Sequence, residues 1–277
     1  MSITDVTICH ATSEDDFTQV QFLFRAYLFP VTYLFGIISN TINALVFSQK
    51  AMRAQPVNLF FLALSISDLI TLVSSFFVFS VPVYAESSRN LEATVTSVQL
   101  ILWFYPMAQT GLTMSVYVTI LVSVHRYLGV CHPFLIRRIS NSSAVKVVIL
   151  TCVIFSFLFN ISRWFELYAL PCYSALHKSD SVIVFPTELM INEYYTLIYR
   201  NGAYTLVMFL MPFAILSFVN FRIIATLKKS YNLRREMMKG AERPSAPKEI
   251  NGNSELIVAK VVGQTAVTSA DSHTTNG

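Results

Sequence analysis

The chain has 277 residues, of which 54% are hydrophobic and 13% are Asp, Glu, Lys or Arg, and its formal net charge is +4. A soluble domain carries about 25% charged residues. This composition, with the apolar residues gathered into long runs, therefore excludes an ordinary soluble domain and indicates an integral membrane protein. The small net charge gives no ground for a nucleic-acid partner. The four cysteines show no C-x-x-C spacing, which predicts no metal site.

The N-terminal segment, 1–24, is acidic and lacks the apolar core of a cleavable signal peptide. We expect the apolar span that follows, at about 26–48, to act as a signal anchor. Lys50 and Arg53 come directly after it, so the positive-inside rule places the N-terminus in the extracellular space. Gly36 and Asn40 lie about one turn apart in this span, which suits close helix contact and an interhelical hydrogen bond.

A second apolar span, at about 57–84, contains a single charged residue, Asp68. A carboxylate inside the membrane is costly and marks a functional site by default. The alternative is a protonated Asp68 that bonds to neighbouring serines.

The third span, at about 95–127, ends in His125-Arg126-Tyr127. Either Arg126 extends to the interface from a helix end, or it has a partner at that membrane face. The segment after it is basic through Arg137 and Arg138, so we expect it to face the cytoplasm and lipid headgroups.

The fourth span, at about 144–166, ends in Arg163-Trp164-Phe165-Glu166. Arg163 and Glu166 are three residues apart and can pair on one helix face, although an interfacial anchor is an equally natural interpretation. The fifth span, at about 201–227, contains Pro212, which should bend the helix. The remaining residues, 231–277, are predicted to form a cytoplasmic basic extension and a disordered tail.

Several segments resemble the rhodopsin-like G-protein-coupled receptors, and in particular the FMRFamide-type neuropeptide receptors of invertebrates. The resemblance covers roughly 25–230 and rests on these segments: LSISDL at 64–69, Tyr105-Pro106, Gln109-Thr110, Arg126-Tyr127 with Val130-Cys131-His132-Pro133, NISRWFE at 160–166 and NEYY at 192–195. It implies an all-α bundle of transmembrane helices at the plasma membrane, with five of the usual seven spans. His125 stands where the family has an acidic residue, and Ser162 stands where it has proline.

The resemblance also implies roles for particular residues. His125, Arg126 and Tyr127 would form the motif that couples to a heterotrimeric G protein, and Asn40 and Asp68 would belong to an intramembrane network. Without an acidic partner at His125, we expect Arg126 to be released toward the cytoplasmic face. The implied ligand is an amidated neuropeptide, with these candidate contacts: Gln109, Arg163, Trp164, Glu166 and Tyr194. Glu166 would pair with an arginine of such a peptide.

Receptors of this family commonly join the outer end of helix three to the second outer loop by a disulfide. The family's spacing places Ile101 at the helix-three position, so Cys172 lacks its usual partner. Cys9 is the other cysteine expected outside, where disulfides persist. A Cys9–Cys172 bond, two free thiols and an intermolecular bond remain open.

The family's last two helices have no counterpart here, so we expect a truncated receptor that cannot signal alone. A second hypothesis is a non-signalling membrane partner that dimerises with full-length receptors. A third is a five-span transporter or channel with Asp68 and Arg126 as pathway charges. No nucleophile–base pair or ligand set indicates an enzyme or a cofactor.

Overall fold

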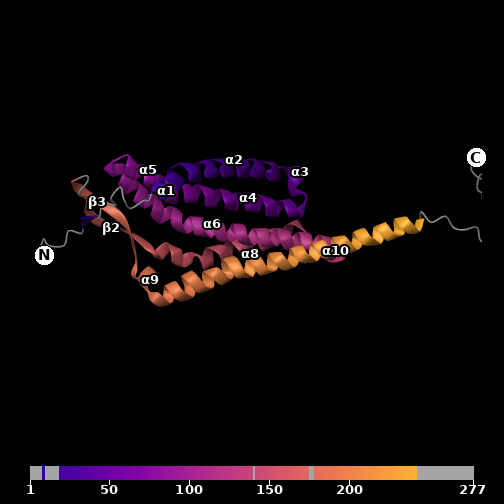
Figure 1. The fold of residues 1–277 in the computed structure, drawn as a ribbon. Helices are drawn as coiled ribbons and strands as arrows, with labels where there is room; N and C mark the ends of the chain where they lie inside the picture. The colour runs from indigo at the N-terminus through magenta and orange to yellow at the C-terminus, as the bar shows by residue number, and fades with distance from the viewer. Residues whose placement is uncertain (1–7, 10–18, 140, 175–177, 242–277) are drawn as a thin grey trace, which may run out of the picture. The chain divides into compact units, whose positions relative to one another are not determined.

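The computed structural model describes residues 8–9, 19–139, 141–174 and 178–241 (Figure 1). Within them, five helical stretches are long and apolar enough to cross a membrane, which confirms the helical membrane bundle. These stretches are Gln19–Ser48, Pro56–Ser87, Leu91–Cys131, Ser142–Phe165 and Tyr195–Met238. The predicted disordered tail, from 242 onward, and most of the N-terminal segment lie outside the described residues.

The first two stretches are each interrupted by a π-helical turn. The first comprises α1 (Gln19–Leu23), η1 (Phe24–Leu28) and α2 (Phe29–Ser48), and the short helix α3 (Lys50–Arg53) follows it. The second comprises α4 (Pro56–Ser75), η2 (Phe76–Ser80) and α5 (Val81–Ser87).

The third stretch is one long helix, α6 (Leu91–Cys131), which leads into α7 (Pro133–Ile139). The fourth comprises α8 (Ser142–Phe159) and a 3-10 helix, η3 (Ile161–Phe165). The fifth follows the short helix α9 (Glu188–Ile191) and comprises η4 (Tyr195–Ala203), η5 (Leu206–Leu210) and α10 (Met211–Ala241).

Several helices begin earlier than the apolar pattern predicts. The first starts at Gln19 rather than 26, and the fifth at Tyr195 rather than 201. A polar N-cap residue can begin a helix before its apolar part. The side chain of Asn90 accepts a hydrogen bond from the Glu92 backbone N–H at 3.0 Å, so α6 begins at Leu91 rather than 95. The predicted spans thus mark the apolar part of each helix and not its ends.

Three of the π-helical turns end two residues before a proline. η1 precedes Pro30, η2 precedes Pro82 and η5 precedes Pro212. Proline lacks a backbone N–H and its ring crowds the carbonyl four residues earlier, which here lies inside the wide turn. The extra backbone length of a π-helical turn relieves that clash. Pro212, predicted to bend the fifth helix, therefore lies directly after such a turn.

The core lies where α4, α6 and α8 meet, around Phe60, Val118 and Cys152. Glycines let these helices approach closely. A Cβ atom on Gly36 would lie 2.8 Å from Leu72 Cδ1, and one on Gly111 would lie 2.7 Å from Thr71 Oγ1. The close contact expected at Gly36 thus connects α2 to α4.

The segment between the fourth and fifth predicted spans contains a β-hairpin that the apolar pattern does not show. β2 (Leu167–Ser174) pairs antiparallel with β3 (Ser179–Pro186), with Leu167 opposite Pro186. The short strand β1 (Ile8–Cys9) pairs parallel with β2. We call this end of the bundle the hairpin end, and the opposite one, where α3 lies, the α3 end (Figure 1).

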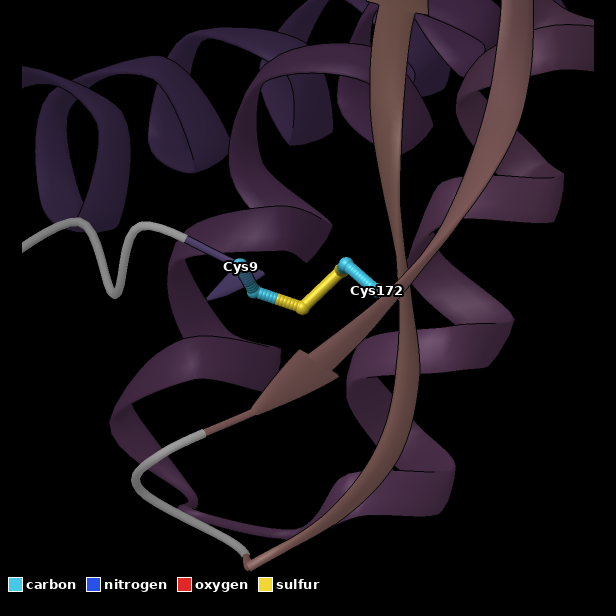
Figure 2. The surroundings of a disulfide bond; sticks show 2 residues. All are labelled: Cys9 and Cys172. Atoms are coloured by element: carbon cyan, nitrogen blue, oxygen red, sulfur yellow. A yellow bond between two sulfur atoms is a disulfide. The ribbon is translucent and has the colours of Figure 1, made fainter. Parts of the chain in front are cut away.

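A disulfide bond joins β1 to β2 through Cys9 and Cys172, 163 residues apart in the sequence (Figure 2). Both cysteines are buried. Of the three alternatives that the sequence left open, the structure contains the intramolecular bond. The N-terminal strand is thereby tied to the hairpin.

The chain divides into two compact units, 1–226 and 227–277. The described part of the second unit is the last part of α10, from Leu227. It is strongly basic, with Lys228, Lys229, Arg234 and Arg235.

Candidate functional site

The carboxylate of Glu166 is the centre of a buried polar cluster at the hairpin end. Glu166 has no exposed surface, and Arg163 is 4% exposed. Arg163 Nη1 donates to Glu166 Oε1 at 3.0 Å and to Oε2 at 3.1 Å. The phenol of Tyr105 on α6 donates to Oε2 at 2.8 Å, and that of Tyr195 on η4 donates to Oε1 at 2.7 Å. Both carboxylate oxygens are therefore satisfied within the protein.

The local backbone explains how Arg163 meets Glu166. At Asn160, α8 ends and the chain tightens into the 3-10 helix η3. Side chains three residues apart eclipse in a 3-10 helix, which places Arg163 over Glu166 more directly than an α-helix would. The Asn160 amide fixes this transition, since its Nδ2 donates to Thr113 Oγ1 at 2.8 Å and to Ser156 O at 2.9 Å.

Tyrosines from the fifth stretch complete the cluster around Arg163. Its guanidinium carbon lies 5.4 Å from the ring centre of Tyr199 and 5.3 Å from that of Tyr204. These distances are within cation–π range, so the charge faces two rings as well as a carboxylate. Tyr204 also donates to Gln109 Oε1 at 3.3 Å. We call Arg163, Glu166 and the phenols of Tyr105 and Tyr195 the hub.

Two of the predicted ligand residues have partners inside the protein in the hub. Glu166 was expected to meet an arginine of the ligand, but it is buried and its oxygens already accept hydrogen bonds from Arg163 and two tyrosines. Arg163 is likewise enclosed. Tyr194 is 77% exposed, whereas the hydroxyl of its neighbour Tyr195 donates to Glu166 Oε1. The Arg163–Glu166 pair therefore joins three helical stretches through its tyrosine partners. It does not present a charge to solvent.

Two other ligand candidates lie beside the hub. Gln109 is partly buried on α6 and accepts the bond from Tyr204. Trp164 packs edge-to-face on Trp103, with ring centres 5.8 Å apart. Tyr105 and Tyr195 belong to the family-like segments of the sequence, but their spacing did not predict that they bond to Glu166. A tyrosine hydroxyl that is buried in an apolar span usually has a hydrogen-bond partner, and this rule could have indicated a buried acceptor near Tyr105 and Tyr195.

Asp68 is partly buried on α4 and accepts a hydrogen bond from Ser115 on α6, with 2.5 Å between Oγ and Oδ1. Asn40 Nδ2 donates to the Gly36 carbonyl of its own helix at 3.0 Å, and within the described part of the chain it forms no hydrogen bond to another helix, which was the expectation. The serines next to Asp68, its alternative predicted partners, donate to backbone carbonyls of α4: Ser65 to Phe61 O and Ser67 to Leu64 O. Asp68 therefore links α4 to α6.

At the α3 end, the side chains of His125, Arg126 and Tyr127 contact three different partners. The His125 ring packs edge-to-face on Phe60 at 5.7 Å, and the exposed Arg126 lies over Phe61 at 5.6 Å. Among the described residues Arg126 has no salt bridge to a carboxylate. Tyr127 faces His132, with 3.4 Å between its hydroxyl and Nε2. Nearby, the Cys131 thiol lies 3.2 Å from the Thr226 hydroxyl on α10.

Both carboxylate oxygens of the hub accept hydrogen bonds inside the protein, whereas the buried Arg163 Nε has no hydrogen-bond partner among the described residues. Asp68 bonds to a serine hydroxyl. No group of three or more His, Cys, Asp or Glu side chains in the described part of the chain is arranged to hold a metal ion.

Comparison with known proteins gives a family match over most of the chain. The model of the 7 transmembrane receptor (rhodopsin family) matches residues 39–268. The FMRFamide receptor of Drosophila melanogaster is 25% identical over 81% of this chain and 41% of its own length. An FMRFamide peptide receptor of Caenorhabditis elegans is 25% identical over 76% of this chain and 48% of its own, and the sex peptide receptor of D. melanogaster is 22% identical over 85% and 55%. The chain thus spans about half the length of the curated relatives it matches.

Proposed function

This chain belongs to the rhodopsin family of seven-transmembrane receptors, and on that basis we propose that it is a membrane receptor for a short peptide. The observation that carries the proposal is its similarity to receptors named for FMRFamide, which extends over four fifths of the chain. The hub supports the proposal, because it joins the third, fourth and fifth stretches at a single end of the bundle.

We propose that the hairpin end faces the outside of the plasma membrane. Lys50 and Arg53 follow the first stretch at the α3 end, and positive charge is enriched on the cytoplasmic side of membrane proteins. The Cys9–Cys172 bond at the hairpin end supports the same orientation, because disulfides persist in oxidising compartments.

The ligand would then approach from the hairpin end. Gln109, Trp164 and Tyr194 remain proposed ligand contacts, as polar or aromatic groups that are not enclosed. Arg163 and Glu166 take a different role: they hold the third, fourth and fifth stretches in fixed register, so that a ligand meets a preorganised wall.

At the α3 end we propose that Arg126 contacts a heterotrimeric G protein. Its guanidinium is exposed and rests on the Phe61 ring, without a salt bridge among the described residues. An arginine held only by a ring face is free to bond to a partner's backbone carbonyls. Peptide binding at the other end would favour the receptor conformation in which this contact is made.

The test is equilibrium binding of radiolabelled FMRFamide to membranes that contain the full chain, with membranes from cells lacking it as the blank. We expect saturable binding that Gln109→Ala weakens by roughly tenfold, since a ligand hydrogen bond and the Tyr204 bond are both lost. Gln99→Ala is the matched control, because Gln99 is an exposed residue of the same helix. Absence of saturable binding to the unmodified chain would contradict the proposed ligand.

A further inference from the structure

A cavity of about 520 Å³ lies at the base of the hairpin, outside the hub. Phe165 at the end of η3, Tyr168 on β2 and Phe185 on β3 contribute aromatic rings to its lining. The rings of Tyr168 and Phe185 pack edge-to-face, with centres 5.9 Å apart. All three rings retain exposed surface, since Phe165 is 64% exposed and the other two 39% each. Its volume is within the range of about 300–1,000 Å³ usual for ligand sites.

One charged residue, Glu188, lines the same cavity. Its side chain is exposed, and it forms no hydrogen bond or ion pair with any other residue that the structure describes. A carboxylate beside several aromatic faces attracts a positively charged group in two ways, by ion pairing and through the negative ring faces. A neutral or anionic group gains neither interaction. The lining therefore selects an organic cation.

Glu92 lines a second cavity at the hairpin end, of about 500 Å³, but the only aromatic residue there is Tyr84, whose hydroxyl donates to the Ala26 carbonyl. The other residues that line it carry neither a charge nor an aromatic ring. The cavity at the hairpin base is thus the better match to a cation.

The wall of this cavity is joined to the hub. Thr187, which lines the cavity, donates from its hydroxyl to the Phe165 carbonyl at 2.7 Å and from its backbone N–H to the Glu166 carbonyl at 2.9 Å. The cavity residue Phe165 and the hub residue Glu166 are also consecutive. One turn of backbone therefore presents a ring to the cavity on one side and a carboxylate to the hub on the other.

We propose that the cavity at the hairpin base, with Glu188 and the rings of Phe165, Tyr168 and Phe185, binds the positively charged group of a peptide ligand. The inference rests on the proposed peptide-receptor function and replaces Glu166 with Glu188 as the carboxylate that meets the cation. A bound cation would press on the turn that carries Glu166, and the hub would transmit that contact to α6 through Tyr105 and to the fifth stretch through Tyr195.

The cation site is tested by saturation-transfer NMR on the full chain in nanodiscs of phosphatidylglycerol, which contain no choline. The two probes are Nα-acetylarginine amide and its neutral isostere Nα-acetylcitrulline amide. We expect the arginine compound to bind in preference to the citrulline compound. Glu188→Gln should weaken binding of the arginine compound by roughly fivefold and remove the preference. Phe185→Leu, which keeps an apolar side chain, should weaken the arginine compound more than the citrulline compound.

Glu193→Gln is the matched control, since Glu193 is exposed, lies five residues further on and does not line the cavity. Equal binding of the two probes, or an equal loss in Glu188→Gln and Glu193→Gln, would overturn the proposal. Thermal unfolding of Glu188→Gln should match that of the unmodified chain, because its carboxylate has no partner among the described residues.

Two further experiments distinguish a peptide from a lipid headgroup as the molecule that supplies the bound cation. If nanodiscs of phosphatidylcholine abolish arginine binding, the site takes a choline headgroup, and the assignment to a peptide is overturned. Radiolabelled FMRFamide is then bound to the same variants, and Glu188→Gln should weaken it as it weakens the arginine compound. If FMRFamide fails to bind while the arginine compound binds with the expected preference, the peptide function fails and the cation site stands.

Discussion

Removal of both members of the Arg163–Glu166 pair should cost less than the sum of the two single removals. Loss of one partner of a buried ion pair leaves an uncompensated charge and costs about 3–5 kcal/mol. After Arg163→Ala, the Glu166 carboxylate keeps the hydrogen bonds from Tyr105 and Tyr195, and bonds to a charged group contribute about 1.5–3 kcal/mol each. After Glu166→Ala, Arg163 keeps two ring faces, which contribute about 0.5–2 kcal/mol each. We therefore expect Glu166→Ala to be the more destabilising of the two.

The double variant removes both charges, so its cost should fall short of the sum of the single costs. For groups in direct contact, this coupling free energy is about 0.5–3 kcal/mol, and the buried position favours the upper part of that range. A loss of 3–5 kcal/mol in a protein of this size lowers the melting temperature by about 6–20 °C.

The assay is thermal unfolding of the full chain in detergent micelles, followed with a dye that reacts with thiols. Cys152 is a buried free cysteine of the core, so its reaction reports loss of packing. Glu193→Gln gives the background effect of removing an exposed carboxylate. Additive costs, or a Glu166→Ala variant that melts with the unmodified chain, would refute the idea that the pair is the centre of the hub.

Gly111→Ala should cost about 1–3 kcal/mol, because its Cβ would lie 2.7 Å from Thr71 Oγ1, which donates to Ser67 O. Gly129→Ala has no atom within 4 Å of the new Cβ and should leave the melting temperature equal or higher; equal losses would contradict close packing at Gly111. Ser115→Ala should cost about 0.6–1.7 kcal/mol in the same assay, as Asp68 loses its donor, whereas Thr119→Ala, whose hydroxyl bonds to its own helix, should cost less. Mass spectrometry without reductant should detect a peptide pair joined through Cys9 and Cys172, and a dimer that reductant dissolves would instead indicate an intermolecular bond. Cys9→Ser should lower stability by about 2–4 kcal/mol relative to Cys131→Ser.

The sequence alone determined the class of protein and the number of spans in the described residues. Apolar runs can be counted because the thickness of the bilayer sets their length. The Arg163–Glu166 pair could also be expected, since both residues lie within one turn. These inferences depend on composition and on spacing of a few residues, which the linear pattern records directly.

The tertiary structure decided what the pair does. Glu166 accepts hydrogen bonds from Tyr105, 61 residues before it, and from Tyr195, 29 residues after it, and no local spacing connects these three residues. The same holds for Cys9 and Cys172, and for the ring set around Glu188, which meets only after β2 and β3 pair. An exposed acid and a buried one look alike in the sequence. Packing decides which carboxylate has its hydrogen bonds filled inside the protein and which is left to meet a ligand, because desolvation and partners depend on the residues that the fold brings around it.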